Sequence, residues 1–324
     1  MSRIQHFVEK ISQLRVLVVG DIIFDRYIFG AAQRISSEAP VPVIEVGSEA
    51  DVAGGAANVA MNIASIGGQV SLMGTVGCDT AFDALRAILE RSQIHCDAIE
   101  ASPERSTVEK TRVLAQRQQV CRIDREGPFN SYQLSDASLD ALSLEPFDLV
   151  IVSDYSKGTV DDRLLKRLKI LAGDTPICID PKPPRVRDYS DLTLIKPNKK
   201  EALLLAGQDP AGPFNAESVI TELHSRYQPK HIVITLGSEG MLLSSAGKPT
   251  EALPTEAREV FDVSGAGDTV ISLLGPALAL GYSLQEAAVF ANIAAGIVVG
   301  RMGTYAIKRE DLIDPNLICE TGDS

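Results

Sequence analysis

The sequence predicts an α/β protein whose mostly parallel sheet is covered by helices on both faces. Short apolar runs rich in β-branched residues alternate along the chain with helix-length amphipathic segments. Strands buried on both faces are continuous apolar runs, and strands that alternate with helices pair in parallel. In addition, no Pro-, Ser- or Gly-rich linker, repeat or low-complexity tract divides the chain. We therefore expect one doubly wound domain spanning residues 1–324.

The core elements follow one another along the chain. The predicted strands are residues 15–20, 70–75, 148–152, 176–179, 192–195 and 231–235, and the predicted helices are residues 58–66, 81–91, 161–172, 216–227, 267–280 and 284–299. Two regions, about 22–47 and 107–125, break this alternation, because they have strand propensity and alternating charges but no helical period. We expect both to form antiparallel strands outside the main sheet, as a small inserted lid.

Composition excludes several classes of function. The chain has 31 Lys and Arg residues against 43 Asp and Glu residues, and its net charge of -12 disfavours a nucleic-acid partner. Its five cysteines include no C-x-x-C pair, which indicates a reducing compartment rather than a disulfide framework or a zinc site. Because no run of 18 apolar residues and no leader-like segment is present, we expect a cytoplasmic protein with no membrane partner.

Several catalytic motifs are absent. The four His residues have no H-E-x-x-H or H-x-E spacing, and no G-x-S-x-G motif surrounds a serine. There is no G-x-x-x-x-G-K-[ST] loop, and no G-x-G-x-x-G motif follows the first strand. A nucleotide would therefore have to bind by another device.

The most informative segment is a turn of small residues that leads into an apolar helix. It contains Gly265, Ala266, Gly267 and Asp268. Backbone N–H groups at a helix N-terminus attract phosphate. Asp268 could then accept a proton from an alcohol while the amides of the turn hold the charge on a transferred phosphoryl group. An ordinary capped helix with a favourably placed Asp is the alternative.

A second glycine-rich helix start precedes Asn58. Gly54 and Gly55 would let a small ligand approach the backbone, and Asn58 offers both donors and an acceptor to sugar hydroxyls. Close packing of helix on sheet explains the glycines equally well. Asp21 ends the first strand, where open α/β sheets bind ligands, although it could also cap a loop.

Three further segments complete the candidate site. Asn198 and Glu201 lie three residues apart at a helix start, so both could face hydrated Mg²⁺ and phosphate, or could form a capping box. The turn that includes Thr235, Gly237 and Gly240 could admit a nucleotide, or could be an ordinary hairpin turn. Asn292 lies in the last long apolar helix.

The residues resemble those of the ribokinase/PfkB family of carbohydrate kinases. Its two signatures, Gly-Gly-x-x-Asn and Gly-Ala-Gly-Asp, occur in the right order at residues 54–58 and 265–268. Residues 20–27, 34–43, 54–65 and 153–158 are similar to those of the branch that phosphorylates the anomeric hydroxyl of D-glycero-D-manno-heptose 7-phosphate, in ADP-heptose and lipopolysaccharide inner-core synthesis. Some members of that branch are fused to a nucleotidyltransferase domain. This sequence has no H-x-G-H motif, so we expect the kinase step alone.

The resemblance implies a ribokinase-like fold and roles for particular residues. Asp268 would be the catalytic base, beside the anion hole of Gly265, Ala266 and Gly267. The nucleotide and its Mg²⁺ would contact Asn198, Glu201, Thr235, Gly237, Gly240 and Asn292, the metal being reached through water by Asn198 and Glu201. The sugar would contact Asp21, Gly54, Gly55 and Asn58. The implied cofactors are ATP and Mg²⁺, and a monovalent cation is left open. After Asp268, Leu273 stands where most members have a small residue.

A phosphorylated substrate needs cationic partners. The candidates are Arg26, Arg34, Lys110, Arg112, Arg122, Lys157 and Lys182. We favour Lys110 and Arg112, which are alternate residues of one strand and share a face, and Lys157 beside Asp154. Each could instead be a solvated surface charge. The lid should close over the sugar and exclude water, and in this family such lids often pair between subunits, which implies a homodimer. Two other functions remain open: a kinase for another sugar or sugar phosphate, and a catalytically silent sugar-binding regulator.

Overall fold

The computed structural model describes residues 2–116, 118–186, 188–256, 261–301 and 303–313. Its core is a nine-stranded sheet with the strand order β13-β12-β11-β10-β9-β8-β1-β4-β5. The strands are β1 (Arg15–Gly20), β4 (Gln69–Gly77), β5 (His95–Ser102), β8 (Leu149–Ser153), β9 (Ile177–Asp180), β10 (Leu194–Ile195), β11 (His231–Thr235), β12 (Met241–Ser245) and β13 (Glu251–Leu253). All pairings from β5 to β11 are parallel, and only β12 and β13 pair antiparallel. The predicted mostly parallel sheet is confirmed.

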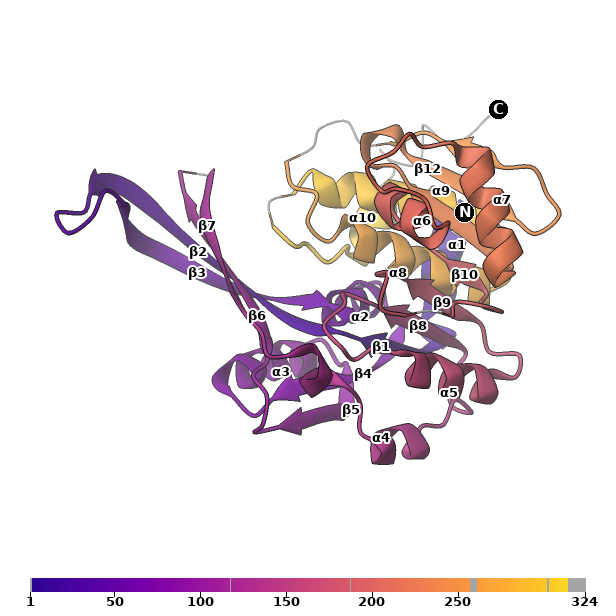
Figure 1. The fold of residues 1–324 in the computed structure, drawn as a ribbon, viewed down its shortest axis with the longest axis horizontal. Helices are drawn as coiled ribbons and strands as arrows, with labels where there is room; N and C mark the ends of the chain where they lie inside the picture. Colours follow the sequence, from indigo (N-terminus) through magenta and orange to yellow (C-terminus); the bar gives the residue numbers. More distant parts are fainter. Residues whose placement is uncertain (1, 117, 187, 257–260, 302, 314–324) are drawn as a thin grey trace.

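Helices cover both faces of this sheet (Figure 1). Along β1, Val16 and Val18 belong to one apolar cluster while Leu17 and Val19 belong to the other, as expected for a strand buried on both faces. The first cluster is completed by α1 (Arg3–Lys10), α2 (Ala56–Ser65), α3 (Thr80–Arg91), α8 (Ala266–Ala279) and α9 (Leu284–Val299). The second is completed by α4 (Asp136–Ala141), α5 (Asp162–Ala172), α6 (Lys199–Leu205) and α7 (Ala216–Tyr227). A short helix, α10 (Arg309–Ile313), follows. Every helix in the described ranges is too short or too polar to cross a bilayer.

A second sheet of four strands projects from the core, and we call it the lid sheet (Figure 1). Its order is β3-β2-β6-β7, and its strands are β2 (Ile22–Ile35), β3 (Pro42–Gly55), β6 (Val108–Ala115) and β7 (Gln118–Arg125). The two hairpins are antiparallel, as expected, but β2 and β6 join them by a parallel pairing that the sequence did not predict. Strand β3 also continues to Gly55, beyond the predicted end at residue 47. The prediction was too short because this part of the strand contains Asp51, Gly54 and Gly55, which are residue types depleted in strands.

Several elements of the core were not predicted, among them α1 and β5. Helix α1 is short, although Ser2 and Gln5 form a capping box at its start. Strand β5 lies at the edge of the main sheet and is largely exposed, so its sequence lacks the apolar run that marks the inner strands.

Leu273 lies in the middle of α8 and is fully buried. It belongs to the apolar cluster between α8, α2 and the sheet, so the large side chain fills core volume at this position. We expect Leu273→Ala to lower the free energy of unfolding by about 2–5 kcal/mol, because truncation loses apolar burial and leaves a cavity. Urea denaturation followed by circular dichroism measures this. A loss typical of an exposed site would contradict the packing described.

Candidate active site

The carboxyl ends of the parallel strands bring polar residues to one edge of the main sheet. Asp21 follows β1, Asp154 follows β8 and Lys196 follows β10. Asp180 and Thr235 are the last residues of β9 and β11. Open α/β sheets bind ligands at this edge, so the strand topology itself defines the candidate site.

The turn before α8 lies at the same edge. Gly265 is the N-cap of the helix and has a left-handed backbone with φ 80°. A Cβ atom at this residue would lie 2.9 Å from Asn58 Nδ2, so only glycine fits without displacing Asn58. The turn therefore brings the N-terminus of a 14-residue helix against the glycine-rich start of α2. The N–H groups at a helix N-terminus attract anions, although that of Ala266 also donates to the Val263 carbonyl at 3.3 Å.

Asp268 lies in the first turn of α8 and is only 3% exposed. The Tyr155 hydroxyl donates to its Oδ1 at 2.6 Å, and Asn58 Nδ2 donates to its Oδ2 at 2.7 Å. Burial raises the pKa of Asp268, while these two hydrogen bonds act in the opposite direction. A buried carboxylate with a raised pKa and a fixed orientation is suited to act as a general base.

The glycines before α2 are explained by two aspartates. A Cβ atom at Gly54 would collide with the Asp25 carboxyl group. Gly55 has φ 58°, and a Cβ atom there would collide with the Asp21 backbone oxygen. The backbone at residues 54–55 thus lies directly against Asp25, whose carboxyl group also accepts a hydrogen bond from Arg112.

Asp21 is buried and both of its carboxylate oxygens are engaged by the protein. Oδ2 accepts from the backbone N–H groups of Tyr155 and Lys157, at 2.8 and 2.9 Å, and Oδ1 accepts from that of Thr159 at 2.9 Å. We predicted Asp21 to contact the sugar. The carboxylate also caps the loop of residues 154–159, which was the alternative interpretation of Asp21, and its contact with the sugar stays a prediction.

The two favoured cations of β6 do share a face, as expected from their spacing. Lys110 Nζ lies 5.4 Å from the centre of the Tyr155 ring, and the Arg112 guanidinium lies 5.2 Å from that of Tyr27. Among the described residues, no carboxylate forms an ion pair with Lys110, and burial lowers the pKa of this amine. Arg112, by contrast, is paired with Asp25.

Asp154 and Lys157 lie close in sequence but have different partners. Asp154 accepts from the backbone N–H groups of Ser156 and Lys182, and burial raises its pKa to about 8. Lys157 forms an ion pair with Glu126. The remaining cations of the pool that have ion pairs are Arg26 with Asp51, Arg122 with Asp124, and Lys182 with Glu201.

A cavity of about 370 Å³ lies between the β11–β12 turn, the start of α8 and α9. All four predicted nucleotide contacts of this region line it, together with two residues of the anion turn: Thr235, Gly237, Gly240, Asn292, Ala266 and Gly267. The Asn292 amide also donates to the Pro254 carbonyl at 2.7 Å, so it supports the cavity wall. The hairpin is real as well, since β11 and β12 pair across this turn.

Asn198 and Glu201 form a capping box, which was the expected alternative to a contact with Mg²⁺ and phosphate. Asn198 Oδ1 accepts from the Glu201 N–H at 3.0 Å, and Glu201 Oε2 accepts from the Asn198 N–H at 2.9 Å. Glu201 Oε1 also accepts from Lys182 Nζ at 2.6 Å. The box fixes the Glu201 carboxylate at the start of α6.

An ion pair that the sequence did not predict lies beside the anion turn. Lys196 Nζ is 2.8 Å from Asp180 Oδ2, and a Cβ atom at Gly267 would contact both groups at 3.5 and 3.8 Å. Burial raises the pKa of Asp180 to about 7, and the Lys196 ammonium acts against this rise. A cation and a carboxylate therefore face the N-terminus of α8.

These features were compared with those of known proteins. A family model described as pfkB family carbohydrate kinase matches residues 13–311. The chain belongs to this family. It is a sugar kinase with a ribokinase-like fold, as predicted.

Relatives and solved structures agree with this assignment. The kinase is 43% identical over 314 residues to "Bifunctional protein HldE" of Nitrosococcus oceani, covering 95% of this chain and 65% of that protein. It is 43% identical over 309 residues to the protein of the same name from Haemophilus influenzae, covering 93% of this chain and 63% of that protein. It therefore spans slightly less than two thirds of these relatives. Arabidopsis thaliana ribokinase, solved with ribose and ATP, superposes with a TM-score of 0.73 at 20% identity, covering 94% and 98% of the two chains. Phosphofructokinase-2 from Escherichia coli superposes with a TM-score of 0.72 at 17% sequence identity, covering 92% of this chain and 96% of that chain.

Four residues of the candidate site had no predicted role. Tyr155, Asp180 and Lys196 each lie at or just after the end of a parallel strand, which is the signal that singled out Asp21. Asp25 lies inside a strand of the lid sheet, where no local pattern distinguishes it from a solvated charge.

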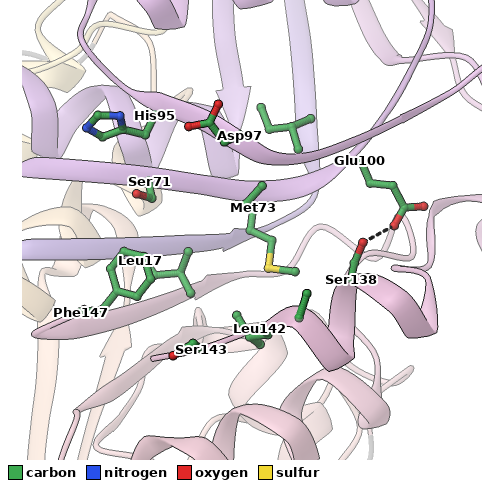
Figure 2. A pocket seen from close by; sticks show the side chains of 13 residues that line it. Leu17, Ser71, Met73, His95, Asp97, Glu100, Ser138, Leu142, Ser143 and Phe147 are labelled. Carbon is green, nitrogen blue, oxygen red and sulfur yellow. Dashed lines mark hydrogen bonds between the residues drawn. The ribbon is translucent and has the colours of Figure 1, made fainter. Parts of the chain in front are cut away.

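A larger cavity, of about 610 Å³, lies elsewhere in the kinase, between β1, β4, β5 and α4 (Figure 2). Leu17, Met73 and Leu142 form its apolar floor, and Ser138 Oγ donates to Glu100 Oε2 at 2.8 Å at one end. None of the predicted site residues lines it. The larger cavity therefore does not coincide with the candidate site.

Proposed function

We propose that this sugar kinase transfers the γ-phosphoryl group of ATP to the anomeric hydroxyl of D-glycero-D-manno-heptose 7-phosphate, giving the 1,7-bisphosphate. The observation that carries the proposal is a buried base at an anion-binding helix start. The same site contains a half-buried cation that has no ion pair within the described part of the chain. Asp268 supplies the base and Lys110 supplies the cation. Sequence similarity over residues 20–27 and 153–158 to the heptose-kinase branch supports this choice of sugar.

In the proposed mechanism, Asp268 accepts the proton of the sugar hydroxyl as its oxygen attacks the γ-phosphorus. The bond to the oxygen that bridges the β- and γ-phosphates breaks, and ADP leaves with the electron pair. The N-terminus of α8, at Gly265, Ala266 and Gly267, stabilises the charge on the transferred group. Asn58 holds Asp268 in place through its amide. The lid sheet covers the sugar and excludes water.

The substrate phosphate is expected to bind beside Lys110. The half-buried Lys110 ammonium has lost hydration and has no carboxylate partner in the ranges that the structure describes, so a phosphate would supply a favourable interaction. The positive charge of Arg112 is already balanced by Asp25. Arg112 can therefore donate hydrogen bonds to the substrate phosphate without adding net positive charge to the site. We propose that Asp25, which lies against Gly54, also accepts hydrogen bonds from sugar hydroxyls.

We propose the 370 Å³ cavity as the nucleotide site, with Thr235, Gly237, Gly240 and Asn292 as its walls. Among the described residues, no three His, Cys, Asp or Glu side chains cluster so as to hold a metal by themselves. Both Glu201 oxygens already accept one hydrogen bond each, and each can accept a second. Glu201 and Asn198 thus suit a Mg²⁺ ion held through water and phosphate, which when bound neutralises phosphate charge.

A coupled assay of ADP release tests the function. The panel contains D-glycero-D-manno-heptose 7-phosphate, fructose 6-phosphate, fructose 1-phosphate, ribose and adenosine, each with Mg·ATP. We expect selective turnover of the heptose phosphate. Preference for another sugar would overturn the substrate, and a protein that binds sugar without any turnover would be a silent regulator.

We also propose that the kinase is a homodimer that pairs through its lid sheet. This sheet projects from the core (Figure 1) and exposes large apolar side chains, including Ile35, Val46 and Ile123 at 56–64%. Exposed apolar surface of this kind favours association. Sedimentation equilibrium is expected to give twice the chain mass, and a monomer would contradict the proposal.

A further inference from the structure

Tyr155 connects the loop after β8 to the proposed catalytic base. Its hydroxyl donates to Asp268 Oδ1 at 2.6 Å. Burial raises the pKa of Tyr155 well above its ordinary value, so the phenol keeps its proton and acts only as a donor towards the carboxylate. The ammonium of Lys110 lies over its ring. The phenol is thus fixed at one end by the base and on one face by the lid sheet.

Asp21 fixes the backbone that carries this phenol. Its two oxygens accept three backbone N–H groups of the 154–159 loop, at 2.8 to 2.9 Å. Ser156 in this loop has φ 57°, a conformation that residues other than glycine seldom adopt. The buried Asp21 carboxylate accepts hydrogen bonds from the N–H groups on both sides of Ser156 and so stabilises that conformation.

We propose that Tyr155 is a positioning residue for Asp268, and that Asp21 acts on the base through the loop and this phenol. The inference rests on the proposed function, because it assigns Asp268 the role of base. Each carboxylate oxygen can accept two hydrogen bonds. With Tyr155 on Oδ1 and Asn58 on Oδ2, the carboxylate is fixed in orientation, and a lone pair remains for the sugar hydroxyl.

Other charges around the base act on its ionisation as well. Lys196, from the end of β10, favours the carboxylate, whereas Asp25, from β2, opposes it. Asp180, from β9, lies near enough to interact with both Asp268 and Tyr155. Since none of these groups changes when the phenol oxygen is removed, a change in pH profile reports on the hydrogen bond itself.

The test is Tyr155→Phe, which removes one oxygen and keeps the ring under Lys110. We expect kcat to fall about tenfold at neutral pH and the acid limb of kcat/KM to move up by about one pH unit, because the carboxylate loses a donor. The KM for ATP should stay unchanged. The matched control is Tyr189→Phe, since the Tyr189 hydroxyl is buried with no hydrogen-bond partner among the described residues and lies in the other apolar cluster.

Asp21→Asn tests the second step. We expect it to lower kcat, as Tyr155→Phe does. In the Tyr155→Phe background it should add little further loss, because both changes remove the same contact. A purely structural Asp21 would give an additive loss and an unshifted acid limb. An unshifted limb in Tyr155→Phe, or a rise in the sugar KM alone, would overturn the proposal.

A measurement on the free protein separates this inference from the proposed function. The carboxyl ¹³C resonance of Asp268, assigned by its loss in Asp268→Asn, is titrated in wild type and in Tyr155→Phe. We expect its pKa to rise by about one unit in the variant. If the heptose phosphate is not a substrate, this shift still supports the contact, and equal titration curves overturn it whichever sugar is phosphorylated.

Discussion

Asp268→Asn is expected to leave a folded protein that binds ATP and to lower kcat by about 10²–10⁴-fold, the usual contribution of a general base. The amide has nearly the same shape as the carboxylate, and its oxygen can still accept from Asn58 or Tyr155. It cannot take the proton of the attacking hydroxyl. Steady-state kinetics, with ATP affinity measured by calorimetry, separates lost chemistry from lost binding.

The matched control for this change is Asp97→Asn. Asp97 is exposed at the edge strand β5 and lines the cavity on the other side of the sheet. This control should stay within about twofold of the wild-type rate, as is usual for a surface substitution. Near-normal turnover of Asp268→Asn would refute the assignment of the base.

The same carboxylate should control the acid side of the pH profile. Burial raises the pKa of Asp268, and only the deprotonated form can accept the hydroxyl proton. Activity should therefore fall as pH decreases through this raised pKa, at a higher pH than for an exposed aspartate. Profiles of kcat/KM measure this, and the residual activity of Asp268→Asn should lack that acid limb.

Sequence patterns predict the main sheet well because its strands are buried on both faces. Continuous apolar runs mark β1, β8, β9 and β11, and the turns at residues 54–58 and 265–268 mark the two helix starts. The lid sheet is harder to predict. Its strands carry charges on exposed faces, and the parallel pairing of β2 with β6 joins segments about 85 residues apart, which no local pattern encodes.

Some site residues can likewise be predicted from local sequence patterns, and others depend on contacts between distant parts of the chain. The sequence identifies groups whose position follows from the backbone, such as Gly265 and Asp268 at the start of α8. It does not show what surrounds the carboxylates of Asp21 and Asp25, because the groups that meet them come from other parts of the chain. Three N–H groups of the 154–159 loop occupy Asp21, while Asp25 lies against Gly54. That difference arises only when β1, β2 and the loop after β8 meet.

The second large effect on activity is expected at the proposed binding site for the substrate phosphate, beside Lys110, which we call the phosphate clamp. Lys110→Met keeps the length and apolar stem of the side chain and removes its charge. Loss of a charge-assisted hydrogen bond, about 1.5–3 kcal/mol, is expected to raise the KM for the heptose phosphate about 10–100-fold while the KM for ATP is unchanged. Because Lys110 is half-buried with a lowered pKa, removing the charge should not reduce stability.

Lys110 also contacts Tyr155, so a fall in kcat alone would not identify a phosphate clamp. The decisive quantity is the ratio of kcat/KM for the heptose phosphate to that for the unphosphorylated heptose. A clamp contributes only to the phosphorylated sugar, so Lys110→Met should collapse this ratio, whereas an effect through Tyr155 lowers both values equally. Lys166→Met, at an exposed position of α5, is the matched control and should leave the ratio intact. A preserved ratio in Lys110→Met would move the clamp to Arg112 or Lys157.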